Sequence, residues 1–145
     1  LIITDNYNLD TTEIAMSNFS SADLLNYQQR YTEAIKKYDA ILSSFSGHTL
    51  SDEIFMRKAE IFLKEGKLQK ALLELEKIED SWDYDILADD AVYMRAQVYD
   101  FKLQDTEKAM LLYEKILLEH SGSVYVEDSR NRYRELRGDN INNTE

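Results

Sequence analysis

The chain has 145 residues and a formal net charge of −11, with 43% hydrophobic residues, 31% charged residues, and neither cysteine nor proline. This length suits one domain with a substantial core, and the absence of proline favours long uninterrupted helices. The excess of acids argues against binding to nucleic acid or docking on an anionic membrane surface, and without cysteine there are no disulfides or thiolate metal sites.

No apolar run reaches the roughly 18 residues that span a bilayer, so direct membrane insertion is not expected. The chain begins at Leu1 without a basic segment followed by an apolar one. We therefore interpret it as a mature or truncated fragment that does not include a targeting signal.

The pattern of apolar residues predicts helices along most of the chain. Residues 1–10 are expected to be an N-terminal extension, and Asp10 with Glu13 is typical of a capping box at a helix start. Ser51 is the expected N-cap of a central hairpin, and Gly138 is the expected left-handed stop of the last helix. The predicted helical segments are 11–28, 31–45, the hairpin 51–80 with its turn at 64–67, 86–102, 106–119 and 124–137.

A repeat becomes visible when residues at the same place in successive hairpins are aligned. Four columns recur at intervals of 37 or 38 residues: Ala22, Ala59 and Ala96; Ala34, Ala71 and Ala109; Tyr38, Leu75 and Tyr113; Ile41, Ile78 and Ile116. This indicates one helix hairpin used three times, with the alanines buried where two helices approach closely. We expect the extra residue of the third copy in the turn between Asp100 and Asp105, where an insertion costs little.

The pattern resembles the tetratricopeptide repeat (TPR) family, whose first helix carries a small residue followed three positions later by a large one. Small and aromatic positions then alternate along the second helix. In the central copy the matching residues are Ala59, Phe62, Ala71 and Leu75, with Gly66 at the turn; the others match through Ala22, Leu25, Ala34 and Tyr38, and through Ala96, Tyr99, Ala109 and Tyr113. The period exceeds the family's usual ~34 residues, and its closing proline is missing.

The resemblance implies an all-α, TPR-like right-handed superhelix. It would consist of three antiparallel hairpins, at about 11–45, 51–80 and 86–119, and a C-terminal capping helix at 123–137, so that the domain spans 11–137 and 138–145 is a disordered tail. The ending SGSVYVEDSRNRYRELRGD is similar to the close of TPR proteins of the bacterial cell envelope. That similarity would place the protein in the periplasm or envelope, although the residues alone do not fix the compartment.

Nothing in the sequence indicates catalysis. The two histidines, His48 and His120, both fall in loops between repeats, and there is no Gly-rich phosphate loop or HExxH motif. We therefore predict no enzyme activity, no cofactor and no metal site.

An acidic run between Glu79 and Asp90 contains six acids and no base in twelve residues. It either caps a helix and stays solvated, which its position in a first turn favours, or binds calcium or a basic partner. The EF-hand spacing and its central glycine are missing. Trp82 and Tyr84 within the run either reach a partner or fold back over the second hairpin.

The main functional hypothesis concerns the concave face, which the first helix of each hairpin lines in TPR stacks. Carried over copy by copy, the partner-binding positions are Phe19, Asp23, Tyr27, Met56, Glu60, Leu63, Tyr93, Gln97 and Phe101, with Met16, Asn26, Glu53, Lys64, Asp90 and Asp100 beside them. They would form an apolar floor with an acidic rim, as recognition of a peptide or helix requires. The alternative is that some of them pack against the neighbouring hairpin.

The charges at these positions restrict the class of partner that the protein could bind. Where TPR modules that clamp a C-terminal carboxylate carry Lys and Asn, this chain has Asp23, Met56 and Glu60, so the rim would repel a carboxylate. Arg130, Arg134 and Arg137 share one face of the last helix. They either pair with carboxylates of the preceding hairpin and the helix end, or hold an acidic partner or another copy of the chain.

We therefore predict a non-catalytic protein-protein interaction scaffold that binds a partner peptide or helix of basic and apolar character. The alternative is a structural domain that self-associates into homo-oligomers within a larger envelope assembly.

Overall fold

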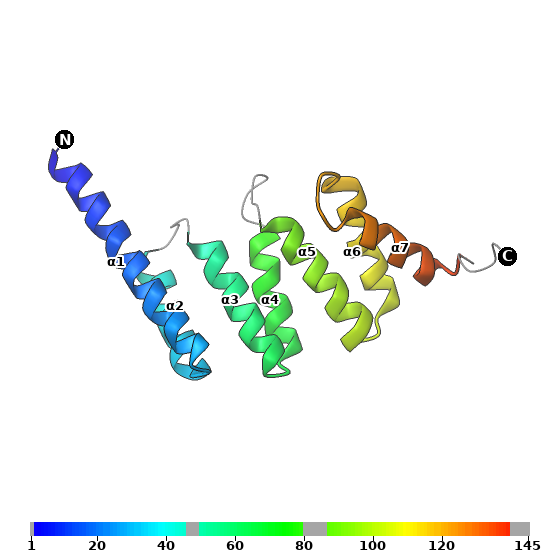
Figure 1. Ribbon diagram of the computed structural model, residues 1–145, viewed down its shortest axis with the longest axis horizontal. Coiled ribbons are helices and arrows are strands. Elements are labelled where there is room, and N and C mark those ends of the chain that lie inside the picture. The colour runs from blue at the N-terminus through cyan, green and yellow to red at the C-terminus, as the bar shows by residue number, and fades with distance from the viewer. Residues whose placement is uncertain (1, 46–49, 80–86, 140–145) are drawn as a thin grey trace.

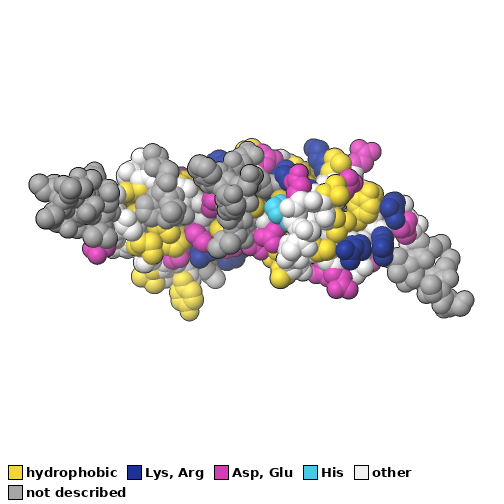
Figure 2. All heavy atoms as spheres, turned by 90° about the horizontal axis from the view of Figure 1, so that it is seen from above, with side chains coloured by type: hydrophobic (Ala, Val, Ile, Leu, Met, Phe, Trp, Pro, Cys, Tyr) yellow, Lys and Arg dark blue, Asp and Glu magenta, His cyan; other side chains and the backbone are white. Residues whose placement is uncertain are grey.

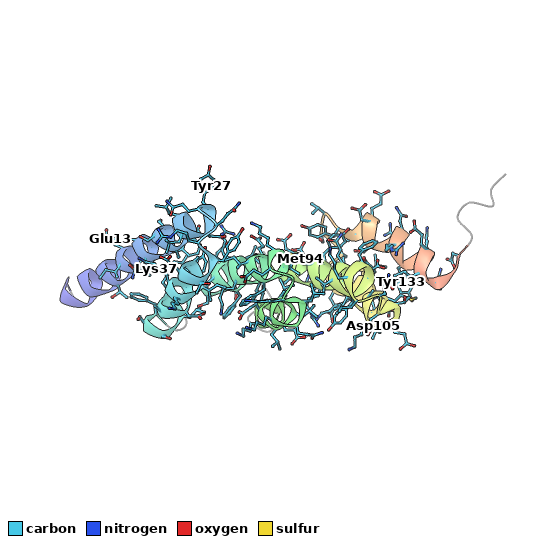
Figure 3. The ribbon with its side chains drawn as sticks, turned by 90° about the horizontal axis from the view of Figure 1, so that it is seen from below. Glu13, Tyr27, Lys37, Met94, Asp105 and Tyr133 are labelled. Atoms are coloured by element: carbon cyan, nitrogen blue, oxygen red, sulfur yellow. The ribbon has the colours of Figure 1, made fainter. Side chains whose placement is uncertain are left out.

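The computed structural model describes residues 2–45, 50–79 and 87–139, and these residues form helices and turns without a strand (Figure 1). The helices are α1 Ile2–Tyr27, α2 Tyr31–Ser44, α3 Ser51–Lys64, α4 Leu68–Glu79, α5 Ala88–Gln97, the π-helical segment η1 Val98–Lys102, α6 Thr106–Glu119 and α7 Val126–Arg137. Consecutive helices pack side by side in one elongated row, so the predicted all-α hairpin repeat is confirmed. Seen from below, α2, α4 and α6 lie along one edge of the row (Figure 3).

The core follows the repeat columns. All twelve residues of the four columns are buried, and none of them is more than 2% exposed. The alanines let the two helices of each pair approach closely, while Tyr38, Leu75 and Tyr113 fill the space beside them. Close packing of this kind leaves no room for an extra methylene group without displacing a helix.

We expect Ala59→Leu to destabilise the protein by about 1–3 kcal/mol, because the larger side chain must force α3 away from α4. Ala40, which is exposed on α2, offers the matched control. Ala40→Leu should change the free energy of unfolding by less than about 0.5 kcal/mol. Urea unfolding followed by circular dichroism measures both, and equal effects at the two positions would show that the alanine contact is not tight.

Two predicted helix starts and one predicted N-cap differ from the structure. α1 already includes Ile2, so it runs through Asp10, and α3 has Leu50 as its N-cap, without a capping bond from a side chain. A capping residue permits a helix start but does not enforce one, because Asp and Ser are tolerated within helices. The last helix begins at Val126 because Ser123 Oγ accepts a hydrogen bond from the backbone N–H of Tyr125, at 3.1 Å, and holds a turn there.

Helix ends agree better with the sequence. Gly138 is the left-handed cap of α7, with a φ of 92°, as predicted. The predicted tail lies outside the described residues except for Gly138 and Asp139.

The extra residue of the third copy widens the end of a helix. In the first two hairpins the closing hydrogen bonds run from the N–H groups of Arg30 and Lys67 to carbonyls five residues earlier. In the third, the aligned bond runs from the Asp105 N–H to the Tyr99 carbonyl, six residues earlier, at 2.8 Å. The insertion is taken up in the π-helical turn η1, so it changes which side chains the end of the helix presents.

All three hairpin turns place a residue in the left-handed region at the same aligned position. That residue is Gly66 in the second copy, with a φ of 74°, but it is Gln29 and Gln104 in the others, with φ values of 61° and 53°. A residue with a Cβ is strained there, whereas glycine is not. A Cβ added at Gly66 would meet no atom within 4 Å, so any penalty at this position comes from the backbone alone.

We therefore expect Gln29→Gly to raise the free energy of unfolding by about 0.5–1 kcal/mol and Gly66→Gln to lower it by a similar amount. Gln69→Gly, in the first turn of α4, is the control and should destabilise instead, since glycine there gains nothing. Thermal unfolding of the three variants tests this expectation. If Gln29→Gly and Gln69→Gly both stabilised the protein, strain in the left-handed conformation could not be the cause.

Candidate functional site

A shallow pocket of about 300 Å³ lies where the end of α3 meets α5 and η1. Its lining residues are Leu63, Met94, Gln97, Val98, Phe101 and Lys102. Leu63, Gln97 and Phe101 belong to the predicted partner-binding set, so the structure brings these three together around one apolar depression. Met94 lies near the middle of the row in Figure 3, and Phe101 is 57% exposed at the rim.

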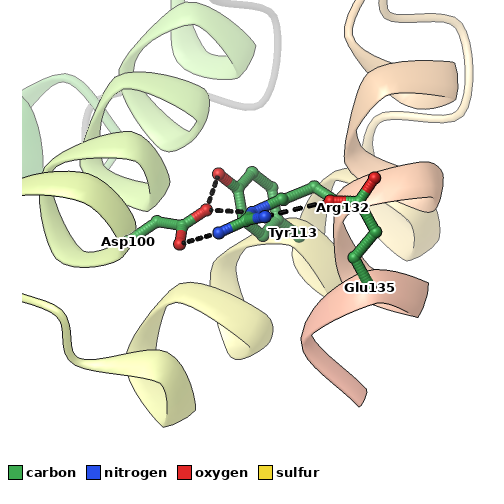
Figure 4. A network of polar contacts seen from close by, with 4 residues as sticks. All are labelled: Asp100, Tyr113, Arg132 and Glu135. Carbon is green, nitrogen blue, oxygen red and sulfur yellow. Dashed lines mark hydrogen bonds and ion pairs between the residues drawn. The ribbon is translucent and has the colours of Figure 1, made fainter. Parts of the chain in front are cut away.

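The rim of this pocket is fixed by a polar network beneath η1 (Figure 4). Arg132 of α7 donates two hydrogen bonds to the carboxylate of Asp100, at 2.7 and 2.8 Å, and the Tyr113 hydroxyl donates to the same carboxylate at 2.9 Å. Arg132 also donates to Glu135 at 2.9 Å. Its guanidinium carbon lies 4.9 Å from the centre of the Phe101 ring, so α7 supports the exposed aromatic from behind.

Burial and charge set the pKa values in this network. The bonds from Arg132 lower the pKa of Asp100 below its usual value, against the opposing effect of burial, and the bond from Tyr113 adds to the lowering. The Asp100 side chain is only 3% exposed. Asp100, predicted to lie beside the groove, is therefore a structural group that anchors η1 to α6 and α7.

We expect Asp100→Asn to destabilise the protein by about 2 kcal/mol at neutral pH, because the amide removes the charge that pairs with Arg132 and replaces one acceptor oxygen by an NH2 donor. The folded-state pKa of Asp100 lies below the unfolded value, so its contribution is present at neutral pH and is lost as the pH falls from about 5 towards 2. Urea midpoints across that range should fall less steeply in Asp100→Asn than in the wild type. Glu107→Gln, an exposed change on α6, should leave the slope unchanged; a wild-type slope in Asp100→Asn would contradict the assignment.

Tyr93, predicted to lie in the open apolar floor of the groove, is covered by another side chain. Its ring stacks on Tyr125, with the ring centres 4.2 Å apart, and the Tyr125 hydroxyl donates to Asp90 at 2.5 Å. The bond to Asp90, together with burial, raises the pKa of Tyr125 to about 12. The neighbouring Asp89 accepts from the Ser123 hydroxyl at 2.6 Å, so these two acids hold the segment that covers Tyr93.

The remaining predicted positions differ in exposure. Met56 is 5% exposed and belongs to the core beside Ala59 and Leu75, so its assignment to the open face is wrong. Phe19 is half-buried against Tyr38, with the ring centres 6.0 Å apart. Tyr27, by contrast, is 87% exposed and points away from the rest of the molecule in Figure 3.

The predicted partner-binding set contains two acids, Asp23 and Glu60. Asp23 accepts a hydrogen bond from the Tyr38 hydroxyl and lies 3.4 Å from Arg57. Glu60 is half-buried on α3, three residues before the pocket residue Leu63, and therefore on the same helix face. Burial raises the pKa of Glu60; Arg57 and Lys64 oppose this effect, and other carboxylates nearby reinforce it. No described residue forms a hydrogen bond or ion pair with Glu60, so a cation brought to it would gain an acceptor.

Sequence reasoning missed Met94, Val98 and Lys102 as pocket residues. A spacing signal was available, because Met94 and Phe101 are seven residues apart, two turns on one helix face. Of the three arginines predicted to share a face of the last helix, Arg137 pairs with Asp139 at the helix end. The arginine that bonds a carboxylate of the preceding hairpin is Arg132, which contacts Asp100 and also Glu135. In Figure 2, Lys and Arg side chains gather towards the C-terminal end, where α7 lies.

Within residues 2–45, 50–79 and 87–139, no three His, Cys, Asp or Glu side chains are grouped so that they could hold a metal ion. His48, Trp82, Tyr84 and most of the acidic run lie outside these residues, so the calcium and aromatic hypotheses stay predictions. His120 follows α6 as its C-cap. None of the described helices is both long enough and apolar enough to cross a membrane.

Comparison with known families gives one finding. The model of a family described as "Tetratricopeptide repeat protein 21 ARM repeat" matches residues 6–116, from within α1 into the last turn of α6. A comparison with curated proteins finds no similar one. The match confirms the resemblance to TPR-type helical repeats, whereas the similarity to bacterial envelope proteins stays a prediction.

Proposed function

Because the chain belongs to the Tetratricopeptide repeat protein 21 ARM repeat family, we propose that it is a non-catalytic scaffold that binds a peptide or helix of a partner protein. The proposed binding surface comprises the pocket between α3 and η1 and the acidic side chain of Glu60 next to it. Helical-repeat proteins expose extended surfaces rather than enclosed reaction cavities, and protein partners are their usual ligands.

The observation that carries this proposal is the pocket around Leu63 and Phe101. Its volume of about 300 Å³ suits one large apolar side chain of a partner. Because Phe101 is supported by Arg132, the rim is preorganised, which lowers the entropy cost of binding.

The charge of Glu60 indicates which side chain the partner should place beside the pocket. A half-buried carboxylate such as Glu60 gains most from a partner cation, since an ion pair offsets the cost of burying the charge. A peptide that places a lysine or arginine about one helical turn from a leucine or phenylalanine would satisfy both Glu60 and the pocket. This motif agrees with the basic and apolar character predicted from the sequence.

A displayed library of random peptides, selected on the intact chain, should enrich this combination of a cation and a large apolar side chain. We expect Phe101→Ala to weaken binding of a selected peptide by about tenfold, because it removes one wall of the pocket. Leu111 of α6, which is 67% exposed and outside the pocket, gives a matched control. Leu111→Ala should bind the peptide as the wild type does in fluorescence anisotropy.

A second variant tests the contribution of the Glu60 charge to peptide binding separately from the fit of the apolar side chain in the pocket. Glu60→Gln should weaken binding of the selected peptide but not of the same peptide with its cation replaced by glutamine, and Glu107→Gln should change neither. Enrichment of acidic peptides instead, or equal losses in Phe101→Ala and Leu111→Ala, would contradict the proposed surface.

Self-association is the second candidate, and exposed apolar side chains on α1 favour it. Met16, Leu24 and Tyr27 are 46%, 56% and 87% exposed, and their spacing places them within one side of the helix. Sedimentation velocity distinguishes the candidates, because a scaffold that binds foreign peptides should stay monomeric as its concentration rises.

A further inference from the structure

A second and larger pocket, of about 500 Å³, opens between α2 and α4, with α3 at its base. Its lining residues are Thr32, Ile35, Lys36, Asp39, Lys58, Phe62, Glu65, Lys67, Lys70, Leu73, Glu74 and Lys77. Five lysines and three carboxylates give the lining a net charge of +2, in a chain whose net charge is −11. We call this depression the lysine pocket.

The base of the lysine pocket is neutralised internally. Lys58 is 7% exposed, and its ammonium lies 2.7 Å from Asp39 and 3.0 Å from Glu74. Burial by itself would lower the pKa of Lys58, but the bonds to these two carboxylates raise it above its usual value, so Lys58 stays charged. Lys77 lies 3.2 Å from Glu74 and balances the second carboxylate.

The excess positive charge is therefore at the rim. Glu65 and Lys67 pair with each other at 3.4 Å, which leaves Lys36 and Lys70 as the source of the net +2. Among the described residues, no carboxylate pairs with either of them. Two unneutralised ammonium groups at the mouth of a pocket attract an anionic ligand.

The walls between these charges are apolar. Ile35 and Phe62 line the pocket, and Leu73 is 58% exposed, a large value for a leucine next to a depression. The Lys70 ammonium lies 5.7 Å from the centre of the Phe62 ring, so charge and aromatic surface are adjacent. The ligand should therefore combine acidic and apolar groups.

The apolar walls also bear on the size of the ligand. An inorganic anion such as phosphate has no apolar group to place against Ile35, Phe62 and Leu73, whereas a peptide carries carboxylates and apolar side chains together. The lining therefore favours a polypeptide ligand over a small anion.

We propose that the lysine pocket binds an acidic peptide segment of a partner protein, with one apolar side chain between Leu73 and Phe62 and its carboxylates on Lys36 and Lys70. This surface is opposite in charge to the one around Glu60, so it selects a different ligand. The lysine pocket shares no residue with the surface of the proposed function, so the result of its test does not depend on whether that function is correct.

The test uses the intact chain and a short fluorescein-labelled peptide composed of glutamate, leucine and serine. Lys36→Glu should weaken its binding by about tenfold, since the variant replaces an attraction by a repulsion. Lys37→Glu is the matched control, because Lys37 is adjacent on α2, carries the same charge and does not line the pocket. It should bind within about twofold of the wild type, since the remaining effect is long-range and screened by salt. Circular dichroism verifies that both variants fold.

Four results would each overturn the proposal. Equal losses in Lys36→Glu and Lys37→Glu would show attraction by overall charge alone. Equally tight binding of a peptide of glutamate and serine without leucine, or displacement of the labelled peptide by inorganic phosphate, would show a simple anion site. Self-association in sedimentation velocity that Lys36→Glu abolishes would assign the pocket to a second copy of the chain.

Discussion

The close contact of two helices through alanine is the constraint on which the rest of this structure depends. Each hairpin carries one of the repeated alanines on its first helix and one on its second helix, and all six of these alanines are fully buried. Because the contact fixes the separation and rotation of the two helices, it also decides which side chains remain outside. On α3, Ala59 and Met56 face inward, Lys58 faces the lysine pocket, and Glu60 faces the other surface.

The candidate sites occur where one copy of the hairpin differs from the other copies. Tyr38 and Tyr113 in the outer copies donate hydrogen bonds to Asp23 and Asp100, so these acids are used internally. The central copy has Leu75 at this position, which cannot donate, and its acid Glu60 has a pKa that burial raises. Likewise, the extra residue of the third copy produces η1, which places Phe101 at a pocket rim. A strictly regular repeat would lack both features.

The sequence predicts the interior of this fold better than its surface. The buried columns were identifiable because a burial pattern must recur whenever the same hairpin recurs, and Gly138 was identifiable because its left-handed conformation favours glycine. The positions of Met56 and Tyr93 were not, since a family pattern gives the face of a helix but not what covers it. Tyr93 is covered by Tyr125, more than thirty residues away in the chain, through a turn whose position depends on Ser123. The lysine pocket was equally hidden, because its charges come from three helices and their balance depends on which lysine meets which carboxylate.

The two proposed surfaces share α3 but are electrostatically separate. Lys58 and Glu60 are two residues apart, so their side chains leave the helix in nearly opposite directions. Across a helix of roughly 10 Å diameter and with a Debye length of about 8 Å at physiological ionic strength, charges on the two surfaces are largely screened from each other in solvent. Coupling between two bound partners would then require α3 itself to move, which the buried contacts of Ala59 and the Lys58 ion pairs oppose. On the two proposals together, an acidic and a basic segment would bind at once, with the occupancy of one surface having little effect on the affinity of the other.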